Sequence, residues 1–492
     1  MTSGDVSSGL RWSGISVVCR ELARLGFTIV LARAVGPEAF GIVAQALVYI
    51  GITSLLLDQG FSSALIQRPN LEQDAPGAVV TVNLVVGGAL ALLTVAVAPL
   101  WAGFMSTPQL TLVLTVLAVS LFIRSVSITP RAMLLRQMDY RKIGTADVVA
   151  AVSGGALGVL SAELGASYWA LVIQYVTTEA ALVIVLLLLG AGNRPNLRLH
   201  RLREMAGFSG RAFIAGILIN SISRNIDNLL IGRFLGAEPL AFYGLAYRLL
   251  LLPVQLVSTT IGAVLFPSFS RRATDLDQVR DDLARATRVL AIVSIPAMAI
   301  TAAAAPQLVL LLFGEQWQPA IPIVQVLAIT GAVQAIYYST NAPLVLGLGR
   351  ADLNLRLAWL TTIVSTAGIV AGLPFGPLEV AIGYSVATAL LLPVDWLVRR
   401  HLLGITVRGQ IAALLPAIHT AAWAAATYVL VAAGIVDDDL VALLVGGPAA
   451  LLVGALVFRL GHRSHYRELI QMALRVSGRG APNPVPVDDT LS

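Results

Sequence analysis

Charged and amide side chains interrupt the apolar stretches of this 492-residue chain at helical spacing. They are Arg20, Arg24, Asn220, Arg224, Asp227 and Arg248. Residues three or four positions apart lie on one face of a helix, and a guanidinium group binds a carboxylate or a phosphate through two parallel hydrogen bonds. Two interpretations stay open. Glu21 and Asp227 neutralise neighbouring arginines as structural pairs, or the arginines bind a diphosphate, which suits Arg248 best because no acidic residue lies within one turn of it.

Tyrosine and amide side chains recur at the same spacing in other apolar stretches. They are Gln45, Tyr49, Tyr247, Tyr337, Tyr338 and Asn341. Such stripes can stack on sugar rings and bond to their hydroxyl groups, but they are equally typical of contacts between membrane helices. Glu179 lies near the middle of a further apolar stretch and is a candidate to carry a coupling proton or cation. Four further charged residues lie near the cytoplasmic ends of predicted helices, and we expect them to snorkel or to be interfacial: Asp58, Arg124, Asp147 and Asp395.

The elements that must position these side chains are membrane-spanning helices. Of the residues, 57% are hydrophobic and 12% are charged, against about 25% charged in a typical soluble domain. Apolar stretches of about 20 residues, enough to cross a bilayer as a helix, occur near 12–33, 40–66, 77–102, 108–128, 143–164, 167–190, 205–233, 240–267, 285–313, 320–346, 354–373, 378–398, 410–434 and 440–460. We therefore predict an all-α polytopic membrane protein with about fourteen transmembrane helices.

Arginine is distributed unevenly among the connections between these helices. It is frequent in 129–142, 192–204 and 270–285 and in the tail after residue 460, but almost absent from the intervening connections. Because basic residues are retained on the cytoplasmic side, we predict a multi-pass protein of the cytoplasmic (inner) membrane with both termini in the cytoplasm. The formal net charge of +6 suits an anionic lipid surface better than a nucleic acid.

An internal repeat indicates how the helices are grouped. Residues 28–46 align without a gap with residues 228–246, so that Arg33 matches Arg233 and Gly36 matches Gly236. A chance match is the alternative. The repeat predicts two six-helix lobes in the same orientation, of the kind that rock around a central site in transporters. The lobes are 1–190 and 205–402, two additional helices occupy 410–460, and 461–492 is a cytoplasmic tail whose Pro-rich end is expected to be disordered.

Three segments carry a resemblance to a known family: 224–271, "LLFGEQWQPAIPIVQVLA" at 311–328 and "NAPLVLGLGRADLNLR" at 341–356. The chain resembles the polysaccharide-transport branch of the MOP superfamily, the Wzx-like oligosaccharide flippases, from about residue 8 to about residue 400. The resemblance implies a MATE/MOP-like bundle of alternating access. It also implies movement of a polyprenyl-(di)phosphate-linked oligosaccharide across the membrane for the biosynthesis of a cell-surface polysaccharide such as lipopolysaccharide.

Two other function classes are weighed against a flippase. A cation-coupled small-molecule exporter of the MATE type would need acidic residues to dominate its site, whereas arginines are prominent here. A membrane polysaccharide polymerase or glycosyltransferase would need sizeable outer loops for catalytic residues, whereas these connections are short. No GxxxxGK[ST] motif is present, so a proton or sodium gradient is a more natural energy source than bound ATP.

The residue types also limit the cofactors and partners. Cys19 is the only cysteine, and the five histidines form no pair at metal-ligand spacing on an apolar helix. We therefore expect no disulfide, metal or other cofactor, and a transporter rather than an enzyme. The expected partners are the lipid-linked oligosaccharide, membrane lipids and polysaccharide assembly proteins, with no nucleic acid.

Overall fold

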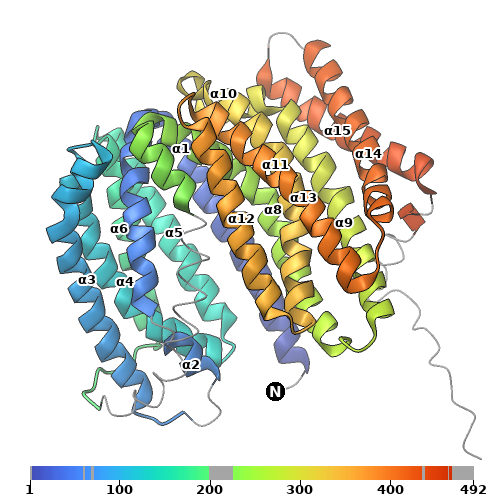
Figure 1. Ribbon diagram of the computed structural model, residues 1–492. Helices are drawn as coiled ribbons and strands as arrows, with labels where there is room; N and C mark the ends of the chain where they lie inside the picture. Colours follow the sequence, from blue (N-terminus) through green and yellow to red (C-terminus); the bar gives the residue numbers. More distant parts are fainter. Residues whose placement is uncertain are drawn as a thin grey trace, which may run out of the picture. The chain divides into compact units, whose positions relative to one another are not determined.

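The computed structural model describes residues 3–58, 61–67, 71–198, 225–434, 438–463 and 465–467, and every regular element among them is a helix (Figure 1). Eleven of these helices are long and apolar enough to cross a membrane. The predicted all-α membrane architecture is confirmed. The elements are α1 (Ser3–Asp58), α2 (Phe61–Gln67), α3 (Ala75–Met105), α4 (Leu110–Arg136), α5 (Tyr140–Glu163), α6 (Tyr168–Leu188), α8 (Ala237–Arg271), α9 (Leu276–Ala303), α10 (Ala305–Phe313), the 3-10 turn η1 (Glu315–Trp317), α11 (Ala320–Gly347), α12 (Ala351–Gly372), α13 (Pro377–Leu403), α14 (Val407–Gly434) and α15 (Asp439–Gly461).

The helices follow most of the predicted spans closely, but the end of the second span falls in the separate helix α2, the ninth span, 285–313, is divided between α9 and α10, and the first two spans and the seventh also differ. The first two spans are continuous in α1, which bends at Gly36, where the backbone is not helical. The seventh span, 205–233, lies mostly outside the described residues, which resume as a helix over 225–234. Each of the other predicted spans overlaps a helix.

Two glycines that the repeat alignment matches share an unusual backbone conformation. Gly36 has a φ of 77° and Gly236 a φ of 97°, in the left-handed region that glycine adopts without steric cost. Gly36 forms the bend of α1, and Gly236 directly precedes α8. The two copies therefore have the same unusual backbone conformation at the aligned glycine as well as a similar sequence. This favours duplication over a chance match.

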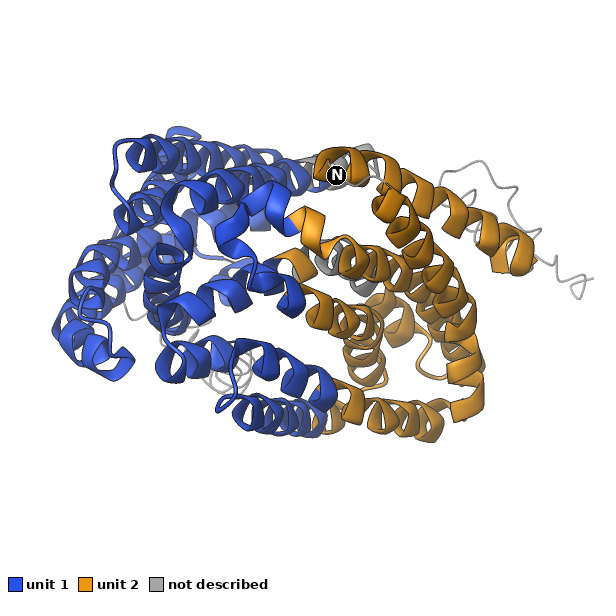
Figure 2. Cartoon of the chain, turned by 90° about the horizontal axis from the view of Figure 1, so that it is seen from above, with its two compact units in different colours: residues 1–248, 309–323, 355–387 blue, residues 249–308, 324–354, 388–492 orange. Residues whose placement is uncertain are grey.

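The chain divides into two compact units, coloured separately in Figure 2. Unit 1 takes its residues from 1–248, 309–323 and 355–387, and unit 2 from 249–308, 324–354 and 388–492. The units group residues by compactness, whereas the predicted lobes, 1–190 and 205–402, follow the repeat along the chain. The lobe boundaries stay a prediction.

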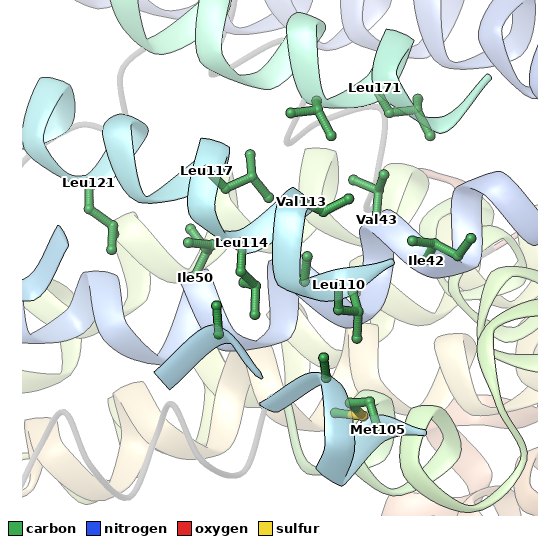
Figure 3. Packing of buried hydrophobic residues seen from close by; sticks show 14 of the residues in the cluster. Ile42, Val43, Ile50, Met105, Leu110, Val113, Leu114, Leu117, Leu121 and Leu171 are labelled. Atoms are coloured by element: carbon green, nitrogen blue, oxygen red, sulfur yellow. The ribbon is translucent and has the colours of Figure 1, made fainter. Parts of the chain in front are cut away.

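The core of unit 1 is built by a leucine-rich stripe on α4 that packs against α1 (Figure 3). The stripe consists of Leu110, Val113, Leu114, Leu117 and Leu121, all fully buried. Their spacing of three and four residues places them on one face of the helix. From α1, Ile42, Val43 and Ile50 belong to the same cluster. This contact fixes the rotation of α4 about its axis, and with it the direction of every later residue on the same face.

A short strap, residues 309–323, packs against α1 beside the bend at Gly36 within unit 1. Arg33 donates Nε to the carbonyl of Leu312 at 2.9 Å and a second bond to Leu311. In return, Trp317 donates Nε1 to the carbonyl of Ala32 at 3.1 Å. Arg33 thereby satisfies carbonyl groups near the end of α10 that lack partners within the helix. The strap and the bend at Gly36 hold each other in place.

Candidate functional site

Charged side chains gather in unit 1 on five helices, and we call them the charge cluster. Its members are Arg20, Glu21 and Arg24 on α1, Arg124 and Arg131 on α4, Asp147 on α5, Glu179 on α6 and Arg248 on α8. Five arginines face three carboxylates, which leaves a formal excess of two positive charges. A charged side chain near the bilayer centre costs about 2.5–3.5 kcal/mol on insertion scales, so such an excess calls for an anion.

Asp147 ties three helices together. Its carboxylate accepts hydrogen bonds from Arg20 of α1 at 2.8 Å and from both terminal nitrogens of Arg131 of α4 at 2.7 and 3.0 Å. The Asp147 side chain is only 9% exposed. This short, bidentate arrangement is the strong form of an ion pair. Asp147 is therefore a largely buried structural hub, seven residues after the start of α5, and its expected interfacial position stays a prediction.

Arg124 lies on a longer helix than the sequence analysis predicted. The predicted span ended near residue 128, but α4 continues to Arg136, so Arg124 lies near the middle of the helix. It is three residues beyond Leu121 and therefore lies on the face of α4 that carries the leucine stripe, although its own side chain is exposed. Arg124 pairs with Glu179 of α6 at 3.4 Å. The expected interfacial position of Arg124 stays a prediction, because the length of α4 does not place the membrane surface along it.

Arg24 and Arg248 carry the least compensated charges of the cluster. Arg24 lies 3.7 Å from Glu21, beyond hydrogen-bonding distance. Arg248 is exposed, and within the described residues it has neither a hydrogen bond nor an ion pair to a carboxylate. The two guanidinium groups are close enough for their charges to repel each other. Both therefore keep donors available for an added anion.

The three arginines on α1, α4 and α8 lie at a similar depth. Arg24 is twelve residues before the bend at Gly36, Arg124 is fourteen after the start of α4, and Arg248 is eleven after the start of α8. At about 1.5 Å per residue, these separations are roughly 17–21 Å along each helix. The bend of α1 and the start of α8 meet, since a Cβ on Gly41 would overlap the backbone of Ala237.

The helix over 225–234 holds a further buried carboxylate. Asp227 accepts a hydrogen bond from the backbone N–H of Asn228 at 2.8 Å and interacts electrostatically with the hydroxyl of Tyr243. Tyr243 stacks on Tyr247, with ring centroids 6.1 Å apart. The predicted partners Asn220 and Arg224 lie outside the described residues. A binding role for Asp227 and Tyr247 stays a prediction.

Gln45 and Tyr49 make contacts between helices in unit 1. Gln45 is fully buried and donates Nε2 to the carbonyl of Gly232 at 2.7 Å. Tyr49 packs edge-on against Trp101 with centroids 5.2 Å apart, and Trp101 in turn donates Nε1 to the carbonyl of Gln45 at 3.3 Å. These contacts join α1, α3 and the helix over 225–234. Binding of sugar by Gln45 and Tyr49 stays a prediction.

In unit 2, the predicted Tyr337 and Asn341 surround a buried arginine that the sequence analysis did not single out. Arg399 of α13 donates Nε to the amide oxygen of Asn341 at 2.8 Å and also bonds to Thr287 and Thr340. Its guanidinium lies 4.5 Å from the centre of the Tyr337 ring, a cation–π contact. The hydroxyl of Tyr337 accepts a 2.6 Å bond from Trp396. We call this set the Arg399 network.

Asp395 completes the Arg399 network, because it accepts a 2.7 Å bond from the amide nitrogen of Asn341. Asp395 is therefore engaged between helices α11 and α13 rather than snorkelling. Tyr338, the next predicted residue on α11, is exposed. Sugar binding by Tyr337, Tyr338 and Asn341 stays a prediction. Elsewhere in the described part of the chain, no three His, Cys, Asp or Glu residues gather as metal ligands.

Comparison with known proteins identifies the relatives of this arrangement. The sequence model of a family described as "Polysaccharide biosynthesis protein" matches residues 30–322. The chain is similar to the teichuronic acid biosynthesis protein TuaB of Bacillus subtilis (strain 168), with 26% identity over 419 residues, 84% of this chain and 85% of TuaB. It is also similar to the succinoglycan biosynthesis transport protein ExoT of Rhizobium meliloti (strain 1021), with 26% identity over 488 residues and 97% of each chain.

Among solved structures, the lipid II flippase MurJ in its inward closed conformation has the same fold. The TM-score is 0.73 at 14% sequence identity, over 93% of this chain and 99% of MurJ.

Proposed function

Because the chain belongs to the polysaccharide biosynthesis protein family, we propose that it is a flippase that moves a polyprenyl-(di)phosphate-linked oligosaccharide across the cytoplasmic membrane. ExoT is described as a transport protein and MurJ as a lipid II flippase, and this chain has the fold of MurJ. The cargo would reach the outer leaflet by alternating access, for the assembly of a cell-surface polysaccharide. The protein acts as a transporter rather than as an enzyme.

The observation that carries this proposal is the excess of positive charge at Arg24 and Arg248. Among the described residues, Arg24 meets a carboxylate only through the long 3.7 Å contact with Glu21, no ion pair joins Arg248 to a carboxylate, and the two guanidinium groups repel each other. A diphosphate between them would provide the missing negative charge and accept several forked hydrogen bonds. A cationic drug would meet repulsion at the same place, so the charge cluster favours an anionic lipid-linked cargo over the cargo of a multidrug exporter.

Removal of the protein tests this function directly. We expect its deletion in the source organism to accumulate a lipid-linked oligosaccharide in the inner leaflet and to abolish one surface polysaccharide, with both effects reversed by a plasmid copy. Lipid extraction with mass spectrometry measures the intermediate, and an impermeant lectin measures its exposure at the outer leaflet. An unchanged lipid-linked pool together with normal surface polysaccharide would contradict the proposal.

We further propose that both termini and the connection after α6 face the cytoplasm. In unit 1, this connection packs against the segment that leads into α3, since Asn196 donates Nδ2 to the carbonyl of Asp74 at 2.8 Å and accepts a bond from Thr81. The same connection carries Arg194 and Arg198. Their positive charges favour the cytoplasmic side.

Cysteine labelling tests this orientation. In a Cys19→Ser background, Leu164→Cys between α5 and α6 and Leu197→Cys after α6 replace side chains that are 80% and 83% exposed. We expect an impermeant maleimide to label position 164 in intact spheroplasts and position 197 only after lysis, because the two connections lie on opposite sides. Labelling of 197 but not 164 before lysis would invert the topology.

A further inference from the structure

Two carboxylates of the charge cluster, Asp147 and Glu179, differ strongly in the number and length of their hydrogen bonds to arginine. Asp147 accepts three hydrogen bonds of 2.7, 2.8 and 3.0 Å from Arg131 and Arg20. Glu179 meets Arg124 through a single contact of 3.4 Å between Oε1 and Nη1. Charge-assisted pairs normally close to about 2.7–2.9 Å. Asp147 is therefore a fixed part of the fold, whereas the Glu179–Arg124 pair is loose.

We propose that Glu179 is an internal counter-ion that holds the place of a substrate phosphate on Arg124, and that the diphosphate of the cargo displaces it. Arg124 thereby becomes a third phosphate-binding residue beside Arg24 and Arg248. This assignment rests on the proposed function, because it takes the cargo to be an anionic lipid-linked oligosaccharide. In the empty protein, Glu179 keeps the guanidinium of Arg124 from standing uncompensated within the membrane-spanning part of α4.

The geometry leaves Arg124 able to exchange its partner. A guanidinium has five N–H donors; on Arg124, Glu179 occupies one of them and the Tyr175 hydroxyl bonds to the same group, which leaves further donors for an anion. The Arg124 side chain is 44% exposed, whereas that of Glu179 is 13% exposed, so the guanidinium is the more accessible of the two groups. The other charges that act on Glu179 are Arg24 of α1, Arg131 of α4 and Asp147 of α5.

Because Glu179 already pairs with Arg124, an incoming anion binds there only if it interacts with Arg124 more favourably than Glu179 does. A chloride ion or a carboxylate offers Arg124 no more than Glu179 does, so it gains nothing by displacing it. A diphosphate carries more charge, and it can form a forked pair with Arg124 while it also contacts Arg24. Since specificity is a difference between affinities, Glu179 selects for a diphosphate over simpler anions. Competition from Glu179 also weakens the binding of the diphosphate, which favours release of the cargo at the outer leaflet.

Binding of farnesyl diphosphate to the purified full-length protein in lipid nanodiscs tests this exchange. Isothermal titration calorimetry compares wild type, Glu179→Gln, Arg124→Ala and the double variant, with farnesyl monophosphate as a second probe. We expect Glu179→Gln to bind the diphosphate about tenfold more tightly and to discriminate less against the monophosphate. Arg124→Ala should bind about tenfold more weakly. In the Arg124→Ala background, Glu179→Gln should give a much smaller gain than in the wild type, because most of the effect of Glu179 passes through Arg124.

Glu163→Gln on α5 is the matched control, since Glu163 is exposed and lies outside the charge cluster; we expect wild-type affinity. Glu179→Asp is the second variant if the glutamine variant does not fold, and its shorter side chain should give an intermediate gain. An unchanged affinity in Glu179→Gln, or an equal gain with and without Arg124, would overturn the exchange. Absence of diphosphate binding by the wild type would instead contradict the proposed function.

Discussion

Flipping of the lipid-linked oligosaccharide is expected to slow by about a hundredfold or more when Arg24 and Arg248 are replaced together by alanine. Each arginine offers charge-assisted contacts to the diphosphate, and the loss of one such contact is worth about 1.5–3 kcal/mol, or at least about tenfold in rate. Two losses add if the residues act independently. The measurement is transport of a fluorescent lipid-linked sugar in reconstituted vesicles, normalised to the amount of folded protein.

The paired lysine variant separates charge from geometry. Arg24→Lys with Arg248→Lys keeps both charges but loses the planar fork, so we expect partial recovery. Arg350→Ala with Arg356→Ala is the matched control, because it removes two positive charges from exposed positions around the start of α12; it should transport normally. Transport at the wild-type rate by the Arg24→Ala/Arg248→Ala protein would refute an anionic cargo bound at this cluster.

Arg399→Ala is expected to destabilise the protein by about 3–5 kcal/mol. The substitution removes three hydrogen bonds from a charged donor and the cation–π contact with Tyr337. It also leaves the amide oxygen of Asn341 and the carboxylate of Asp395 buried with fewer positive neighbours. We expect low abundance in membranes and an earlier thermal transition in detergent, measured by size-exclusion chromatography after heating.

The neighbouring residue on the same helix provides the control. Arg400 is exposed, so Arg400→Ala removes the same charge without opening the network and should leave the thermal transition within a degree or two. Arg399→Lys retains the charge but reaches fewer acceptors, and we expect an intermediate loss. Equal stability of the Arg399→Ala and Arg400→Ala proteins would show that the Arg399 network contributes little to folding.

The fold could be predicted well from the sequence because a membrane helix is recognised by the length and the low polarity of its apolar stretch. The family is confirmed by the match over residues 30–322, and the helices overlap the predicted spans. The sequence predicted two separate helices where the structure has the single bent helix α1. The stretch from Ser3 to Asp58 is helical on both sides of Gly36, and a glycine followed by a proline looks the same in sequence whether the chain bends or forms a loop.

The site could be predicted only in part, because spacing along one helix says nothing of the partner on another. Arg20 and Arg24 were found from their shared face, but their relation to Asp147 and Glu179 depends on the packing of α5 and α6 against α1 and α4. Arg124 could have been found by extending the stripe from Leu117 through Leu121. Arg399 gave no comparable signal, since it is one of two adjacent arginines near a helix end and only packing reveals which one is buried.

The strap at residues 309–323 has a consequence for the order of synthesis. The carbonyls of Ala32 and Arg33 receive their bonds from Gln316 and Trp317, side chains 283–285 residues later in the chain. At about 5–20 residues per second, a ribosome needs roughly a quarter of a minute to a minute to cover that distance. During that interval the corner of α1 at the bend is already synthesised without its final hydrogen-bond partners. A nascent chain released before residue 317 would carry this corner permanently open, and we expect such truncated products to be the forms that membrane proteases remove first.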